Sequence, residues 1–132
     1  AREACAAAGL AARVTTYEGS FLEDALPGGA DLVSLVRVCF DHDDAVVRGL
    51  FTRIHAALPP GGTLLIAEPM AGLPGAERVG SVYFGFYLLA MRSGRPRRPS
   101  ELSKLLQDSG FRDVATHRVA NPLQTGLITA RR

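Results

Sequence analysis

The chain has 132 residues, of which 47% are hydrophobic and 21% charged, and its formal net charge is +2. This length and composition predict a single globular domain with a core of its own. The small net charge gives no indication of nucleic-acid binding. A cluster of four arginines is interpreted as a solvated loop rather than a phosphate site: Arg92, Arg95, Arg97 and Arg98.

Three further features concern the compartment in which the protein works. Cys5 and Cys39 lie far apart without metal-ligand spacing, and Cys39 ends an apolar run, so we expect a buried free thiol in a reducing compartment. No apolar run reaches the length of about 20 residues that a membrane helix needs. The Ala-rich start also lacks the charged-then-apolar order of a signal peptide. The sequence therefore predicts a soluble, cytoplasmic protein without a metal site.

In chain order, the first predicted element is a helix within Ala1–Ala12, closed by Gly9. Because this segment has no initiator methionine and reads as the latter part of a helix, we expect the chain to be part of a longer protein. Arg13–Glu18 follows, rich in β-branched and aromatic residues, and predicts a short strand.

The most informative stretch is Ala30–Met70. Its apolar run Leu32–Val38 predicts a strand, and after an acidic turn apolar residues recur at helical spacing until Pro-Pro-Gly-Gly ends the helix. Thr63–Ala67 then predicts a second apolar strand, followed by Glu68. Two apolar strands joined through a helix predict a parallel βαβ crossover that is buried on both faces. Ligands in such sheets sit beyond the carboxyl ends of the strands, so we expect chemistry within residues 37–44 and 68–70.

The last third predicts two helices and a hairpin. Val79–Met91 is an apolar and aromatic helix with no clear polar face. Ser100 is the predicted N-cap of a second helix that runs to Ser109 and is terminated by Gly110. Two β-compatible segments separated by Asn-Pro predict an antiparallel hairpin at the end of the chain: Arg112–Val119 and Leu123–Ala130. The expected fold class is α/β, with parallel strands closed by an antiparallel hairpin.

Four local sequences carry a family resemblance. They are RVTTYEGSF at 13–21, FDHDD at 40–44, LPPGGTLLIAEP at 58–69 and the aromatic run YFGFYLLAM at 83–91. Together they resemble the class I S-adenosylmethionine-dependent O-methyltransferases that act on small molecules. Within that family they are most similar to bacterial carotenoid hydroxyl methyltransferases of the hydroxyneurosporene or demethylspheroidene type.

The resemblance implies a Rossmann-like sheet of which residues 1–132 form only the carboxyl-terminal part. The Gly-rich loop that holds S-adenosylmethionine, the acidic residue that binds its ribose and the amino-terminal dimerisation region have no counterpart here. We therefore expect the chain to be inactive alone and the full-length protein to be a homodimer.

The resemblance also places cofactor contacts. The position after the third strand of the family, which usually holds an Asp that contacts the adenine amino group, is Ser20 here, and the apolar residue against the ring is Phe21. Val36 and Arg37 are the next cofactor-facing positions. Without the resemblance, Ser20 reads equally well as a loop-capping hydroxyl.

The catalytic positions depart from the family. The His that deprotonates a phenol in many relatives is replaced by Phe40, which cannot take a proton. His42 lies nearby and has a suitable ordinary pKa for a general base, but its acidic neighbours could simply favour a helix N-terminus. Glu68 matches a family glutamate that positions the base. The candidate catalytic residues are therefore His42, Glu68 and Asp41, and a second family glutamate is replaced by Pro96.

The acceptor is expected to be hydrophobic. Phe40, Phe84, Tyr87 and Met91 are candidate substrate contacts, although the aromatic helix could instead form core or a dimer face. A carotenoid tertiary alcohol is the expected acceptor, since it needs positioning more than a base, and contact with a membrane surface is an option because carotenoids partition into lipid. Two alternatives stay open, namely a polyketide or phenolic acceptor and a non-catalytic α/β interaction module.

Overall fold

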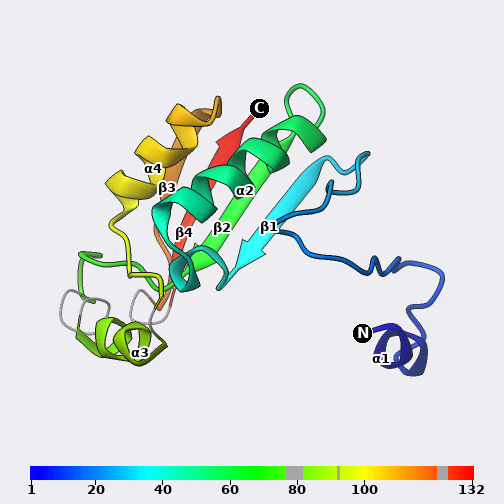
Figure 1. Ribbon diagram of the computed structural model, residues 1–132, viewed down its shortest axis with the longest axis horizontal. Helices are drawn as coiled ribbons and strands as arrows, with labels where there is room; N and C mark the ends of the chain where they lie inside the picture. The colour runs from blue at the N-terminus through cyan, green and yellow to red at the C-terminus, as the bar shows by residue number, and fades with distance from the viewer. Residues whose placement is uncertain (77–81, 92, 122–124) are drawn as a thin grey trace.

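A computed structural model describes residues 1–76, 82–91, 93–121 and 125–132. Helices and strands alternate up to residue 68, after which two helices are followed by two strands (Figure 1). The elements are α1 (Arg2–Ala7), β1 (Leu32–Val36), the 3-10 turn η1 (Cys39–Asp41), α2 (Asp44–Ala57), β2 (Thr63–Glu68), α3 (Phe84–Met91), α4 (Pro99–Asp108), β3 (Arg112–His117) and β4 (Gly126–Arg131).

The four strands form one sheet in the order β1-β2-β4-β3. β1 and β2 are parallel, with Val36 opposite Ala67, which confirms the predicted βαβ crossover. β4 runs antiparallel to both β2 and β3, which confirms the closing hairpin. The first residues of the second predicted hairpin segment, 123 and 124, lie outside the described residues. The predicted α/β class with a mixed sheet is confirmed.

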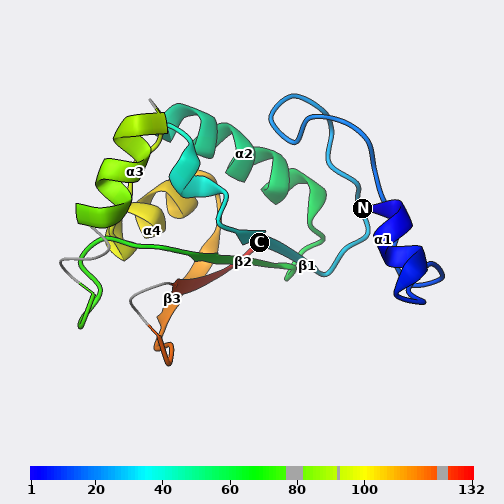
Figure 2. The ribbon, with the colours of Figure 1, turned by 90° about the horizontal axis from the view of Figure 1, so that it is seen from below.

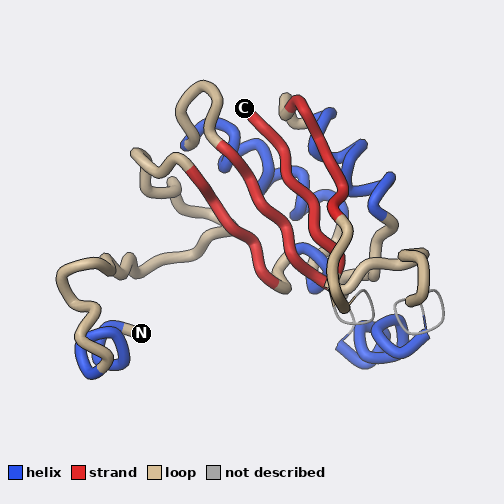
Figure 3. The backbone as a smooth tube through the Cα atoms, turned by 180° about the vertical axis from the view of Figure 1, so that it is seen from behind, coloured by secondary structure: helices blue, strands red, loops and turns tan. Residues whose placement is uncertain are grey.

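The core lies between one face of the sheet and the helices α2 and α4. Figure 2 shows both helices on the same side of the sheet, and Figure 3 shows the opposite face without a helix over it. Leu32 and Val36 of β1 are 53% and 61% exposed. The prediction that these strands are buried on both faces is therefore wrong for the described part of the chain, because its packed helices all lie on one face. The fully buried side chains of this core include Val47, Phe51, Ile54, Leu64, Ile66, Leu102, Leu106 and Ile128.

The predicted strand over Arg13–Glu18 is also wrong. In the structure this segment is an exposed loop that runs with α1 away from the sheet (Figures 1 and 3). A strand needs a neighbouring strand to which its N–H and C=O groups can hydrogen-bond, and β-branched composition alone supplies none. The predicted helix at the start is confirmed but is limited to Arg2–Ala7, with Gly9 at a φ of 71° shortly after it.

The helix boundaries follow local chemistry. α2 presents Val47, Leu50, Phe51 and Ile54 to the core and stops before Pro59, as its spacing predicts. α4 begins at Pro99 rather than after an N-cap at Ser100, because proline fits the first helical position and the Glu101 carboxylate accepts the Arg98 N–H at 2.8 Å. Its predicted terminator, Gly110, has a φ of 97°.

α3 begins later than predicted, at Phe84, and residues 79–81 lie outside the described residues. Phe84 and Leu88 are buried, whereas Phe86 and Leu89 are 70% and 74% exposed. The core interpretation of this helix thus holds for one side only. None of the described helices is long and apolar enough to cross a membrane.

Candidate functional site

The two regions predicted to hold the chemistry meet beyond the carboxyl ends of β1 and β2. β1 is followed by residues 39–44, which we call the acceptor turn, and β2 ends at Glu68. The backbone N–H of Phe40 in this turn donates a hydrogen bond to Glu68 Oε2 at 3.2 Å. The expected convergence of these two strand ends is therefore present, and it is made by a buried carboxylate.

An aromatic cluster lies on the α3 side of the acceptor turn. The ring of Phe40 is only 2% exposed and meets Phe84 edge-to-face at 6.2 Å between centroids. It also stacks on Tyr87, with centroids 6.5 Å apart and planes 25° apart. Three of the four predicted substrate contacts are thus adjacent; the side chain of the fourth, Met91, lies outside the described residues. Tyr87 is 45% exposed, so the cluster presents an aromatic surface to its surroundings.

Arg37 connects this cluster to the end of β1. It has a φ of 55°, and its N–H donates to the carbonyl of Ala67 at 2.9 Å. Its guanidinium carbon lies 5.7 Å from the ring centroid of Phe40 and 5.8 Å from that of Phe84, at cation–π distance. Arg37 was predicted as a cofactor contact, and the structure places its guanidinium against the aromatic cluster.

Glu68 is completely buried. Oε2 holds the acceptor turn, while Oε1, like Oδ1 of Asp41, has no hydrogen-bond partner within the part of the chain that the structure describes. Burial raises the pKa of Glu68 to about 7, although the Phe40 N–H and the Arg97 guanidinium both favour the charged form. Burial, together with the negative charge of Glu68, also raises the pKa of the Cys39 thiol. Cys39 is a buried free thiol, as predicted.

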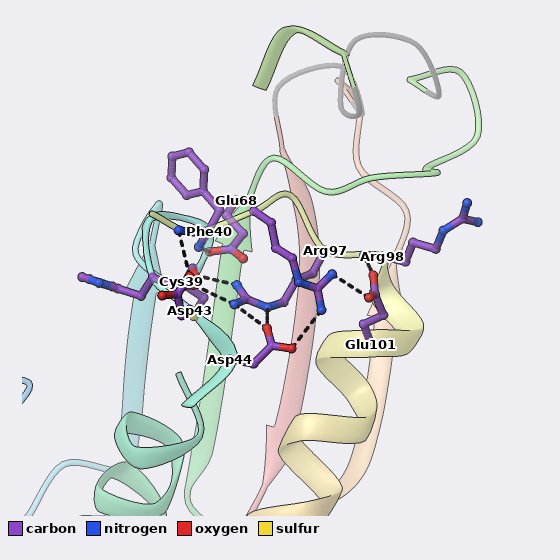
Figure 4. Close-up of polar contacts among 11 residues, drawn as sticks. Cys39, Phe40, Asp43, Asp44, Glu68, Arg97, Arg98 and Glu101 are labelled. Carbon is purple, nitrogen blue, oxygen red and sulfur yellow. Dashed lines mark hydrogen bonds and ion pairs between the residues drawn. The ribbon is translucent and has the colours of Figure 1, made fainter. Parts of the chain in front are cut away.

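Arg97 corrects the sequence interpretation most strongly. It was placed in a solvated arginine loop, yet its side chain is 0% exposed. Figure 4 shows it reaching into the acceptor turn, where Nε donates to Asp44 Oδ1 at 2.7 Å, Nη1 to the carbonyl of Cys39 at 2.7 Å and Nη2 to the carbonyl of His42 at 2.6 Å. The prolines at 96 and 99, which fix the backbone on both sides, were a signal that this segment is ordered.

The neighbouring arginines behave differently. Arg95, with a side chain 44% exposed, bonds Asp44 Oδ2 at 3.0 Å and Glu101 Oε1 at 2.6 Å. Hydrogen bonds from Arg95 and then Arg97 hold the pKa of Asp44 below its usual range. Arg98 is exposed, as expected, and Arg92 lies outside the described residues.

The imidazole of His42 contacts Phe21, a predicted cofactor residue: the two rings meet edge-on, with their centroids 5.8 Å apart. Its carbonyl, not its imidazole, is what Arg97 contacts. The structure therefore groups His42 with a predicted cofactor residue and groups Phe40 with the predicted acceptor residues.

The predicted cofactor positions fit one side of a site for S-adenosylmethionine. Phe21 and Val36 are 44% and 61% exposed, and such open apolar side chains suit a flat purine ring. The Ser20 hydroxyl accepts the Leu22 N–H at 3.3 Å, which agrees with a loop-capping role, and as a hydroxyl it can make a further hydrogen bond. Among the described residues, no group of His, Cys, Asp or Glu side chains could hold a metal ion.

Comparison with known proteins places this geometry in a family. The family model of the O-methyltransferase domain matches residues 1–112. The chain belongs to this family. It is 49% identical over 114 residues to demethylspheroidene O-methyltransferase of Rhodobacter capsulatus. The aligned stretch covers 86% of this chain and 29% of the relative. The corresponding enzyme of Cereibacter sphaeroides is 44% identical over 123 residues, or 93% of this chain and 32% of the relative.

Solved structures agree. Human N-acetylserotonin methyltransferase in complex with SAM (S-adenosylmethionine) superposes with a TM-score of 0.73 and 33% identity, over 88% of this chain and 33% of that one. The described fold matches the carboxyl-terminal part of such methyltransferases. This O-methyltransferase chain thus spans about a third of the length of these relatives.

Proposed function

We propose that this chain is the carboxyl-terminal catalytic part of an enzyme that methylates a hydroxyl of a hydrophobic small molecule, with a carotenoid tertiary alcohol as the acceptor. The observation that carries this proposal is the ring of Phe40, buried against Phe84 and Tyr87 at the strand ends. It supplies an aromatic wall where a phenol methyltransferase would need a proton acceptor. The two demethylspheroidene O-methyltransferase relatives support the same acceptor class.

S-adenosylmethionine, when bound, supplies the activated methyl group. In this chain Phe21 and Val36 offer apolar contacts for it, the Ser20 hydroxyl can accept a hydrogen bond from the adenine amino group, and Arg37 offers hydrogen-bond donors. These side chains would bind the cofactor and orient its methyl group.

The acceptor side works by positioning. The pKa of a tertiary alcohol lies far above neutrality, so no side chain here removes its proton in advance, and the proton leaves to water or a weak base as transfer proceeds. Tyr87, backed by the buried rings of Phe40 and Phe84, packs against the apolar chain of the acceptor and excludes bulk water from it. Holding the oxygen at attack distance supplies much of the rate.

The test is a hybrid enzyme, in which this chain replaces the matching carboxyl-terminal part of the R. capsulatus relative, with the unaltered relative as the positive control. We expect the hybrid to bind S-adenosylmethionine in calorimetry and to methylate demethylspheroidene. A folded hybrid that binds the cofactor but methylates only phenols would overturn the carotenoid assignment. A folded hybrid without cofactor binding would overturn the function as a whole.

We also propose that the complete enzyme is a cytoplasmic homodimer that meets its acceptor at a membrane surface. Three exposed apolar side chains of the α3 region support the membrane contact: Val82 at 54%, Phe86 at 70% and Leu89 at 74%. Carotenoids partition into lipid, so an apolar surface near the acceptor wall suits their uptake. Co-sedimentation of the hybrid with phospholipid vesicles, lost in Phe86→Ser/Leu89→Ser, tests the contact.

A further inference from the structure

We propose that residues 93–97, called the strap, set the position of the acceptor turn, and that Arg97 is the positioning residue through which they do so. The effect on catalysis rests on the function proposed above. The effect on the turn itself does not, because the contacts lie within this chain.

Several hydrogen bonds run from the strap to the acceptor turn. Ser93 Oγ donates to the carbonyl of Asp41 at 3.0 Å, and the Gly94 N–H donates to Asp43 Oδ1 at 3.3 Å. Arg97 adds its donors to Asp44 and to the carbonyls of residues 39 and 42. The turn is therefore held along its whole length by a segment more than 50 residues away in sequence.

Gly94 shows how close the two backbones are. Its φ is 76°, a conformation that L side chains rarely adopt. A Cβ at this position would collide with the carbonyl oxygen of Phe40 and would lie 2.6 Å from the carbonyl carbon of Asp41. The strap can lie against the turn only because residue 94 has no side chain.

Arg97 brackets Phe40. The two carbonyls that it binds, those of Cys39 and His42, stand on either side of Phe40 and Asp41 in the chain. A guanidinium presents its N–H groups in a fixed planar fork, so it determines the spacing of its acceptors, which a lysine ammonium cannot do. The charge is compensated by Asp44 on the same fork.

The strap also links the two parts of the aromatic cluster. It begins two residues after α3, which carries Phe84 and Tyr87, and it ends on the turn that carries Phe40. Fixing the strap on the turn therefore also holds the rings of α3 against Phe40, in the aromatic wall that the acceptor is proposed to meet.

Arg95 provides a matched control. It has the same charge, lies in the same strap and binds the same carboxylate of Asp44, but its side chain is 44% exposed and its other partner is Glu101 rather than the turn. An exposed ion pair of this kind contributes little to the stability of the fold.

The first experiment measures amide hydrogen exchange in this chain for Arg97→Lys and Arg95→Lys. The N–H groups of Phe40, Asp41 and His42, which bond within the site, should exchange at least about tenfold faster in R97K, while that of Ile66 in β2 changes less than about twofold. R95K should leave both sets within about twofold. Unchanged exchange in the turn of R97K, or an equal increase in turn and β2, overturns the proposal.

If R97K does not fold, Gly94→Ala tests the same point, because its Cβ pushes the strap off the turn. The same selective increase is expected, and its absence overturns the proposal.

The second experiment measures steady-state kinetics of the same variants in the hybrid. R97K should lose at least about tenfold in kcat/KM, chiefly in kcat, because the acceptor is misplaced rather than excluded. R95K should stay within about twofold. Selective turn exchange in R97K combined with an inactive parent hybrid would refute the proposed function and leave the strap intact. An active hybrid with unchanged R97K kinetics would refute the positioning role.

Discussion

The proposed acceptor side and the proposed cofactor side of the site are built in opposite ways. On the acceptor side, Phe40, Glu68 and Arg97 are at most 2% exposed and are joined by hydrogen bonds between distant segments. On the cofactor side, Phe21 and Val36 are 44% and 61% exposed. The Ser20 hydroxyl there accepts a local hydrogen bond, from the N–H of Leu22 two residues further along the chain.

This difference shows which part of the site the chain organises by itself. Buried charge and aromatic rings hold their positions only when packed and paired, so the acceptor side is fixed by interactions within these 132 residues. The cofactor side offers open apolar surface, whose order depends on what binds there. Substitutions of the same type should therefore have unequal effects on the two sides.

The largest expected effect comes from removing a ring on each side. Phe40→Ala deletes a ring that is 2% exposed and should lower the free energy of unfolding by about 4 kcal/mol. Phe21→Ala deletes one that is 44% exposed and should lower it by about 0.5 kcal/mol. Urea denaturation of both variants measures the difference. Equal losses would contradict the contrast between the two sides.

A second effect should appear as pH dependence. The pKa of Glu68 is raised from 4.5 to about 7 in the folded chain, so between these values the unfolded state has released a proton that the folded state still binds. Stability should therefore fall as pH rises through this window, by about 3 kcal/mol in total, and level off above it. Urea denaturation at several pH values measures this slope.

Glu68→Gln is the matched variant, because its amide oxygen can still accept the Phe40 N–H while the titrating proton is gone. The slope between pH 4.5 and 7 should largely vanish. Asp44, whose pKa is lowered, contributes in the opposite sense and below about pH 4, so it does not obscure this window. An unchanged slope in E68Q would assign the pH dependence to another group.

The sequence predicted the parts of the fold that depend on local periodicity. The apolar spacing of α2 and the Pro-Pro-Gly-Gly stop locate the crossover, and Gly110 ends α4 as expected. Arg13–Glu18, a loop in the structure, was mispredicted as a strand because strand formation depends on a neighbour that composition does not reveal.

The site was predictable in outline and not in its charges. The strand-end rule brought Phe40 and Glu68 to the same place, and the aromatic run supplied Phe84 and Tyr87. Arg97 was missed because four neighbouring arginines look alike in sequence, and only the tertiary structure shows which one is buried. A long-range ion pair leaves no periodic pattern in the sequence from which it could be predicted.

The smallest expected effect concerns His42, which stands between the two sides. A general base contributes about 10²- to 10⁴-fold in rate. The imidazole of His42 lies against Phe21, and only its carbonyl takes part in the strap contacts, so its side chain should be dispensable on the acceptor side. His42→Ala in the hybrid should therefore change kcat for the carotenoid by less than about threefold. A hundredfold loss of kcat, with cofactor affinity unchanged, would identify His42 as the proton acceptor. Its imidazole would then belong to the acceptor side of the site.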